Sequence, residues 1–174
     1  GSFKDYDTVY NFGKNLKKIT IEIEHVNVEA LIQLEKEGKT IYPKPAVLQI
    51  IQDKGKQKSF YATNDLPTAP FTLLSNLQEV LAGIQNGTIT YPFVQKSCTA
   101  GYDGKGVAVI RNANDLPKLL EGACVIEQLI DFEKELAVIV ARDVDGKTTC
   151  FPAVEMEFHP VANIVEFLLA PAII

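Results

Sequence analysis

The chain has 174 residues, of which 47% are hydrophobic and 22% are charged, a composition typical of a globular protein with a proper core. Its net charge of −5 provides no basic field of the kind that attracts nucleic acid, so we expect no nucleic-acid partner. No apolar run approaches the roughly 20 residues needed to span a bilayer, and no signal peptide is visible, so we expect a cytoplasmic protein without membrane contact. The isolated spacing of Cys98, Cys124 and Cys150 predicts reduced thiols rather than a disulfide or a metal site.

The first 44 residues predict a strand–helix–strand unit, the local pattern of an α/β layer. We expect a helix over residues 8–14 capped by Asp7, and an alternating strand over residues 18–24. A helix then runs from its cap at Asn27 to Gly38, and a short strand at residues 41–42 ends before Pro43.

Residues 45–70 predict a helical linker that ends in an extended segment. Pro45 suits the first turn of a helix over residues 46–53, and a second helix is expected to follow through residues 60–61. The lysines between them, Lys54, Lys56 and Lys58, are typical of a solvated face and could also meet an anion. Pro67 and Pro70 restrict the backbone around them, so residues 66–70 should be extended.

The second half of the chain predicts an antiparallel sheet with two helices, an α+β arrangement. We expect a helix after a cap at Ser75, strands at residues 93–96 and 107–110, and a helix over residues 114–120. Further strands are expected at residues 124–127, 135–142 and 148–154, the last two joined by a turn at residues 143–146.

The connection between the strands at residues 93–96 and 107–110 is rich in glycine and contains a lysine. Gly101, Gly104 and Gly106 would let backbone N–H groups approach anionic oxygens, and Lys105 would add a point charge. This pattern suits a loop that closes over phosphates. An ordinary hairpin with a wide turn explains the same residues, because the loop matches neither the Walker pattern nor the dinucleotide-binding glycine pattern.

Three charged residues form the most suggestive set around this loop. Lys96, at the end of a strand, can reach phosphate oxygens, while Glu127 and Glu135 are placed to flank the connection between two later strands. Surface carboxylates would give the same pattern, so the residues alone leave both interpretations open.

Several sequence blocks resemble the ATP-grasp family of 5-(carboxyamino)imidazole ribonucleotide synthases of purine biosynthesis, in the family's order and across nearly all of the chain. They are residues 20–26 (TIEIEHV), 52–54 (QDK) with 57–58 (QK), 66–71 (LPTAPF), 101–106 (GYDGKG), 125–128 (VIEQ) with Phe132 and Glu135, and 151–153 (FPA) with Glu157 and His159. The sequence departs from the family pattern at residues 97–100, where the family has arginine and glycine, and at Val107, where it has glutamine.

The resemblance implies a fold and a set of nucleotide contacts. It implies an ATP-grasp fold, with the end of an N-terminal α/β domain at residues 1–44, a helical linker at 45–70, a lid lobe at 71–155 and the start of the C-terminal lobe at 156–174. By the same resemblance the residues that contact ATP are the phosphate-binding Lys54 and Lys96, the closing loop Gly101, Tyr102, Asp103, Gly104, Lys105 and Gly106, the adenine hinge Glu127, Gln128, Leu129 and Ile130, the ribose ligand Glu135, and His159.

The resemblance also implies a reaction, in which MgATP and bicarbonate carboxylate the amine of 5-aminoimidazole ribonucleotide through carboxyphosphate. It implies a homodimer for the full-length enzyme, and it makes this chain a central fragment whose magnesium ligands are expected beyond Ile174. We therefore expect the chain alone to bind ATP weakly and to catalyse no carboxylation. Another ATP-grasp carboxylate–amine ligase and a non-catalytic nucleotide-binding module are the alternatives.

Overall fold

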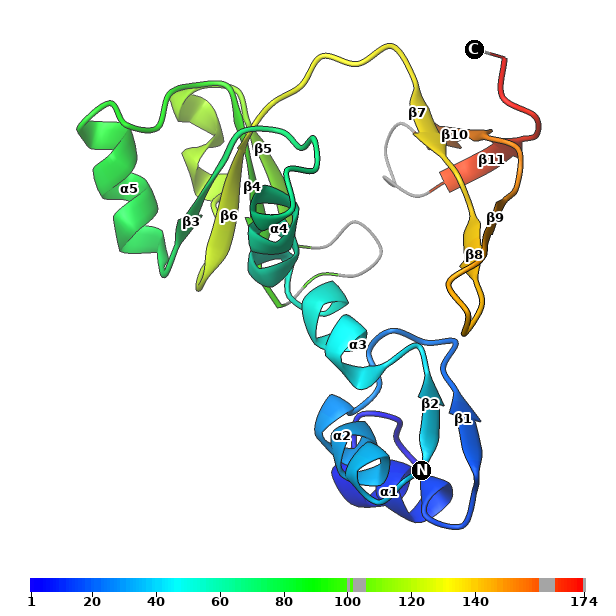
Figure 1. Cartoon of the computed structure of the whole chain (residues 1–174). Helices are drawn as coiled ribbons and strands as arrows, with labels where there is room; N and C mark the ends of the chain where they lie inside the picture. The colour runs from blue at the N-terminus through cyan, green and yellow to red at the C-terminus, as the bar shows by residue number, and fades with distance from the viewer. Residues whose placement is uncertain (100, 102–105, 160–164, 174) are drawn as a thin grey trace.

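The computed structural model describes residues 1–99, 101, 106–159 and 165–173. Its elements form three units in chain order (Figure 1), and the first two each contain a hydrophobic core. Two helices lead from the first unit to the second, and an extended segment leads from the second to the third. The antiparallel sheets and helices agree with the α+β expectation for the second half of the chain.

The first unit contains α1 (Tyr6–Gly13), β1 (Lys18–Thr20), α2 (Val28–Lys36) and β2 (Thr40–Tyr42), and its two strands pair in parallel. The predicted limits of α2 are confirmed, because the Asn27 side chain accepts from the Ala30 N–H at 2.9 Å and Gly38 has a positive φ of 84°. The predicted cap of α1 is wrong. Asp5 accepts from the Thr8 N–H at 2.8 Å, and Asp7 lies inside the first turn.

Two helices follow, α3 (Pro45–Ile51) and α4 (Lys54–Thr63), and α3 ends two residues before the predicted limit at residue 53. Pro45 lies in the first turn of α3, and Asp53 caps α4 by accepting from the N–H groups of Gly55 and Lys56 at 2.8 and 3.1 Å. The segment at residues 66–70 has no regular structure, in agreement with its prolines.

The second unit is a four-stranded antiparallel sheet of order β3-β6-β4-β5, which we call the lid sheet. Its strands are β3 (Phe71–Leu74), β4 (Phe93–Ser97), β5 (Val107–Ile110) and β6 (Cys124–Gln128), and it carries α5 (Leu77–Gln85) and the 3₁₀ helix η1 (Ala113–Lys118). Val80 of α5 packs with Phe93, Ile110 and Ile126 to form the core of the unit. The strands on either side of the glycine-rich loop are confirmed, whereas β3 was not foreseen.

Two details of the helices in this unit differ from the predictions. Asn76, not Ser75, caps α5 by accepting from the Glu79 N–H at 2.9 Å, and Glu79 accepts in return from the Ser75 N–H at 2.7 Å. The helix expected over residues 114–120 is the shorter η1, which contains Pro117 and ends at Lys118.

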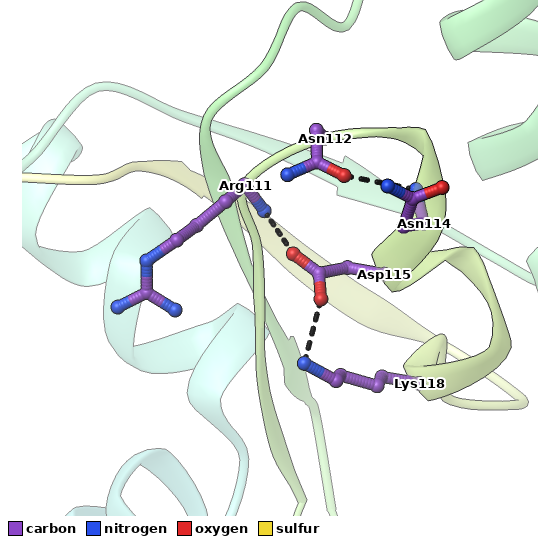
Figure 2. Close-up of polar contacts among 5 residues, drawn as sticks. All are labelled: Arg111, Asn112, Asn114, Asp115 and Lys118. Atoms are coloured by element: carbon purple, nitrogen blue, oxygen red, sulfur yellow. Dashed lines mark hydrogen bonds and ion pairs between the residues drawn. The ribbon is translucent and has the colours of Figure 1, made fainter.

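A cluster of polar contacts closes the turn between β5 and η1 (Figure 2). The Asp115 carboxylate accepts from the Arg111 N–H at 2.8 Å and from the Lys118 ammonium at 2.6 Å. The Asn112 side chain accepts from the Asn114 N–H at 3.0 Å and caps η1. The cluster lies at the surface, with the Lys118 side chain 61% exposed and the Asp115 side chain 15% exposed.

The third unit contains β7 (Glu135–Ala137), β8 (Val140–Arg142), β9 (Thr148–Cys150), β10 (Val154–Phe158) and β11 (Val165–Leu169). The turn at residues 143–146 is confirmed, but the strands on both sides of it are broken. β8 and β9 pair with each other, whereas β7 and β11 pair with β10. The expected strands at residues 135–142 and 148–154 are therefore divided, because their two halves hydrogen-bond to different partners. Within the described residues, no helix is both long and apolar enough to cross a membrane.

Candidate functional site

The face of the lid sheet opposite α5 carries the predicted lysine and glutamate. Val94 is the register partner of Glu127, and Lys96 is the partner of Val125, so these side chains alternate with the core residues Phe93 and Gln95. Helix α4 lies against this face and brings Lys58 to it. The structure therefore brings together Lys96 and Glu127, as well as a lysine that the sequence did not assign to the site.

The Glu127 carboxylate lies between two ammonium groups. Its Oε1 lies 3.0 Å from Nζ of Lys58, and its Oε2 lies 2.8 Å from Nζ of Lys96. The Glu127 side chain is only 7% exposed, that of Lys58 is 11% exposed, and that of Lys96 is 32% exposed. The buried charge is thus paired on both oxygens, and Lys96 is the member of the set that opens to solvent.

The two lysines determine the ionisation of Glu127. Burial works to raise the pKa of Glu127, but the hydrogen bonds and the charges of Lys96 and Lys58 outweigh it and hold the pKa below its ordinary value. Glu127 is therefore an anion at neutral pH. The set carries two positive charges and one negative charge, and this excess suits an anionic ligand at the exposed lysine.

Lys58 is the residue of this set that sequence reasoning missed. Its ammonium also donates to Oγ1 of Thr68 and lies 5.5 Å from the centroid of the Phe71 ring. The signals were the run of lysines at residues 54–58 and the family-like pair at residues 57–58, and neither shows which lysine turns inward. The contacts of Lys58 depend on the packing of α4 against β6, which the local sequence does not reveal.

Close approach of α4 to the lid sheet places Lys58 over Glu127. The Lys54 N–H donates to the Cys98 carbonyl at 2.8 Å and ties the start of α4 to the end of β4. At Gly55 a Cβ atom would lie 3.1 Å from Oδ1 of Asp53 and 3.2 Å from Sγ of Cys98, so a larger residue would fit only if these neighbours moved by a few tenths of an ångström. Lys54 itself is half-buried in the first turn of α4.

The predicted hinge lies at the end of β6. Glu127 and Gln128 are its last residues, Leu129 and Ile130 follow it, and the Gln128 N–H donates to the Pro70 carbonyl at 3.0 Å. A hollow of about 400 Å³ adjoins this segment and is lined by Pro70, Phe71, Thr72, Thr88, Ile89, Thr90, Tyr91, Pro92, Phe93, Ile126, Glu127, Gln128 and Leu129. Its size lies in the range of small-molecule pockets.

The remaining predicted residues lie at other places or outside the described residues. Gly106 has a positive φ of 79°, and its carbonyl accepts from the Ser97 N–H at 2.9 Å at the base of the glycine-rich loop. Gly101 is described, whereas Tyr102, Asp103, Gly104 and Lys105 are not. Glu135, on β7, borders a hollow of about 320 Å³ in the third unit, and His159 follows β10. The lid sheet thus does not hold Glu135 or His159.

The described residues contain no group of three or more histidine, cysteine, aspartate or glutamate side chains that could hold a metal ion. We assign no metal ligand among these residues. All three cysteines are free thiols.

Two family models match the chain. Residues 59–173 match the ATP-grasp domain, and residues 1–52 match the ribonucleotide synthetase preATP-grasp domain. The first match includes Lys58's partners Thr68, Phe71 and Glu127 as well as Lys96. The two matches leave out residues 53–58, which include the first half of α4.

Curated relatives and solved structures agree with these matches. Phosphoribosylaminoimidazole carboxylase of Candida glabrata is 36% identical over 162 residues, 89% of this chain and 28% of the relative. N5-carboxyaminoimidazole ribonucleotide synthase of Synechococcus elongatus is 33% identical over 160 residues, 90% of this chain and 40% of the relative. The structure of N5-carboxyaminoimidazole synthase from Aspergillus clavatus in complex with ADP and 5-aminoimidazole ribonucleotide has a TM-score of 0.85 and 28% identity, over 99% of this chain and 44% of that chain. The chain thus spans less than half the length of each of these proteins.

Proposed function

This chain belongs to the ATP-grasp family, and from that premise we propose that it supplies the ATP-binding lid of an N5-carboxyaminoimidazole ribonucleotide synthase. The observation that carries the proposal is the buried Glu127 carboxylate, which holds the half-exposed ammonium of Lys96 at 2.8 Å on the open face of the lid sheet. A fixed ammonium on such a face can bind a phosphate oxygen through a charge-assisted hydrogen bond.

The nucleotide would lie along this face with its phosphates at Lys96. Lys54, at the start of α4, and the loop from Gly101 to Gly106 would add further contacts to the phosphates. The adenine would lie against the backbone of residues 128–130, beside the hollow at the end of β6. Glu135 would bind the ribose hydroxyl groups. The ADP complex of the Aspergillus clavatus relative, together with the match in fold, supports a nucleotide as the ligand.

The reaction that we propose for the synthase has two steps. A bicarbonate oxygen attacks the γ-phosphorus of ATP, the bond to the β-phosphate oxygen breaks, and carboxyphosphate and ADP form. The amine of 5-aminoimidazole ribonucleotide then takes the carboxyl group, loses a proton, and phosphate leaves. In this scheme Lys96 balances charge on the transferring phosphoryl group, and the lid excludes water from the short-lived carboxyphosphate. Magnesium would arrive with ATP, whose phosphate oxygens are among its preferred ligands.

A segment exchange tests this proposal. The 160 matched residues of the Synechococcus elongatus synthase would be replaced by the corresponding residues of this chain. We expect the chimera to carboxylate 5-aminoimidazole ribonucleotide only when ATP and bicarbonate are both present, and we expect Lys96→Met to abolish this activity. A folded chimera that binds ATP but forms no carboxylated product would contradict the proposed reaction. Light scattering of the chimera would test the predicted homodimer.

A further inference from the structure

We propose that Lys58 is a positioning residue that holds Glu127 where this carboxylate can present the Lys96 ammonium to the phosphates of ATP. The inference rests on the proposed function, because it concerns the same nucleotide site. Its basis is the unequal exposure of the two lysines that flank one carboxylate, since the side chain of Lys58 is 11% exposed and that of Lys96 is 32% exposed.

The contacts of Lys58 are internal. Its ammonium pairs with Oε1 of Glu127 at 3.0 Å, donates to Oγ1 of Thr68 and lies 5.5 Å from the centre of the Phe71 ring. These contacts lie on the lid sheet and on the segment that enters β3. These partners engage the N–H donors of the buried Lys58 ammonium, so its effect on a ligand passes through Glu127.

The two oxygens of the Glu127 carboxylate pair with different lysines, and this arrangement orients the Lys96 ammonium. With Oε1 occupied by Lys58, the carboxylate offers Oε2 to Lys96, and the other N–H groups of Lys96 are left for an exposed anion. Without Lys58, the buried Oε1 would need another donor, because an unpaired buried charge is costly. Lys96 is the cation already in contact, so we expect the carboxylate to turn toward it and to draw its ammonium inward, away from a ligand.

The position of Lys58 follows from how α4 docks. The Lys54 N–H binds the Cys98 carbonyl, and Gly55 permits the close approach of the helix to the sheet. Lys58 is three residues after Gly55 and therefore lies on the same face of α4, one turn further along. The docking contacts thus aim this lysine at Glu127, whereas an exposed lysine on the same helix has no such constraint.

A double-mutant cycle on ATP binding tests the inference. Titration calorimetry would measure ATP binding by the full chain for the parent, Lys58→Met, Lys96→Met and the double variant. If Lys58 acts through Lys96, Lys58→Met should weaken ATP binding about tenfold in the parent but less than about twofold in the Lys96→Met background. Lys118→Met is the matched control. It removes an ammonium from the exposed ion pair with Asp115 (Figure 2) and should leave ATP binding unchanged.

Each outcome is decisive. Equal losses from Lys58→Met in both backgrounds would show that Lys58 acts independently of Lys96 and would overturn the inference, while the proposed function would stand. No ATP binding by the folded parent would contradict the proposed function and the inference with it. Circular dichroism would confirm folding of each variant, and Lys58→Gln would replace Lys58→Met in the same cycle if the methionine variant does not fold.

Discussion

The backbone N–H of Lys54 donates to the carbonyl oxygen of Cys98 at 2.8 Å and joins the first turn of α4 to the end of β4. Two elements that are distant in the sequence meet at this bond, and the helix continues from it across the lid sheet to Lys58 and Glu127. The geometry of the candidate site is therefore determined by how α4 docks as much as by the strands that carry Lys96 and Glu127.

Gly55→Ala tests this docking. Alanine in a helix is normally about 1 kcal/mol more favourable than glycine. Here its Cβ would lie 3.1 Å from Oδ1 of Asp53, and that oxygen cannot easily move because it accepts the N–H groups of Gly55 and Lys56. We expect the free energy of unfolding, measured with urea, to fall by about 1–2 kcal/mol. Ala62→Gly, at an exposed position of α4, measures the effect of alanine against glycine in this helix without a close contact. A Gly55→Ala variant more stable than the parent would contradict the close approach of α4 to its neighbours at Gly55.

Glu127→Gln tests the buried charge. Removing the anion leaves two lysines without their partner, and we expect the free energy of unfolding at pH 7 to fall by about 3 kcal/mol. The lysines lower the pKa of Glu127 in the folded state, so its stabilising contribution is present above the ordinary glutamate pKa of about 4.3 and is lost as pH falls through the lower folded value. The parent should therefore lose stability between about pH 5 and pH 3 more steeply than Glu127→Gln. Equal pH slopes in urea unfolding would be the contrary result.

Local sequence signals predicted the elements whose limits depend on nearby residues. Asn27 and Gly38 delimit α2 as expected, since a side-chain cap and a positive φ are properties of a few adjacent residues. The same signals misplaced two caps. Asp5 and Asp7 are equally suitable by residue type, and only the backbone shows that Asp5 has the extended conformation of a cap.

Long-range pairing was beyond the local signals. The mostly apolar segment 135–142 predicted one strand, but Ala137 pairs with Val154 while Val140 pairs with Cys150. Lys96 and Glu127 were each predicted as site residues, but their ion pair was not. That pair depends on β6 lying beside β4 in the sheet, and the ion pair between Lys58 and Glu127 depends on α4 lying against β6. Such contacts depend on the order of the strands in the sheet, which cannot be predicted from any single segment of the sequence.

Gln95→Leu tests the connection between the lid sheet and the segment after η1. The fully buried Gln95 side chain donates to the Leu120 carbonyl at 2.9 Å and accepts from the Leu120 N–H at 2.7 Å. Leucine would leave both backbone groups unpaired, and we expect the free energy of unfolding to fall by about 2–4 kcal/mol. Gln85→Leu, at an exposed position of α5, is the control. A Gln95→Leu variant as stable as the parent would show that this pair of bonds contributes little.

The three thiols should react at different rates with a disulfide reagent. Burial, with a contribution from Asp53, raises the pKa of Cys98, and burial also raises the pKa of Cys124, so both should be mostly protonated and slow at pH 8. Cys150 is exposed and should react first. Raising the pH should accelerate Cys98, and unfolding in denaturant should make all three groups titrate. A fast reaction of Cys124 in the folded chain would contradict its burial.

The most direct test of the nucleotide site is a comparison of ATP binding by the parent chain and by Lys96→Met, with Lys118→Met as the control. If the Lys96 ammonium binds a phosphate oxygen, its loss should raise the dissociation constant for ATP by about tenfold or more. The control should match the parent, because Lys118 pairs with Asp115 in the exposed turn between β5 and η1. Titration calorimetry that finds the same ATP affinity in the parent and in a folded Lys96→Met variant would contradict the assignment of this face of the lid sheet as the phosphate site.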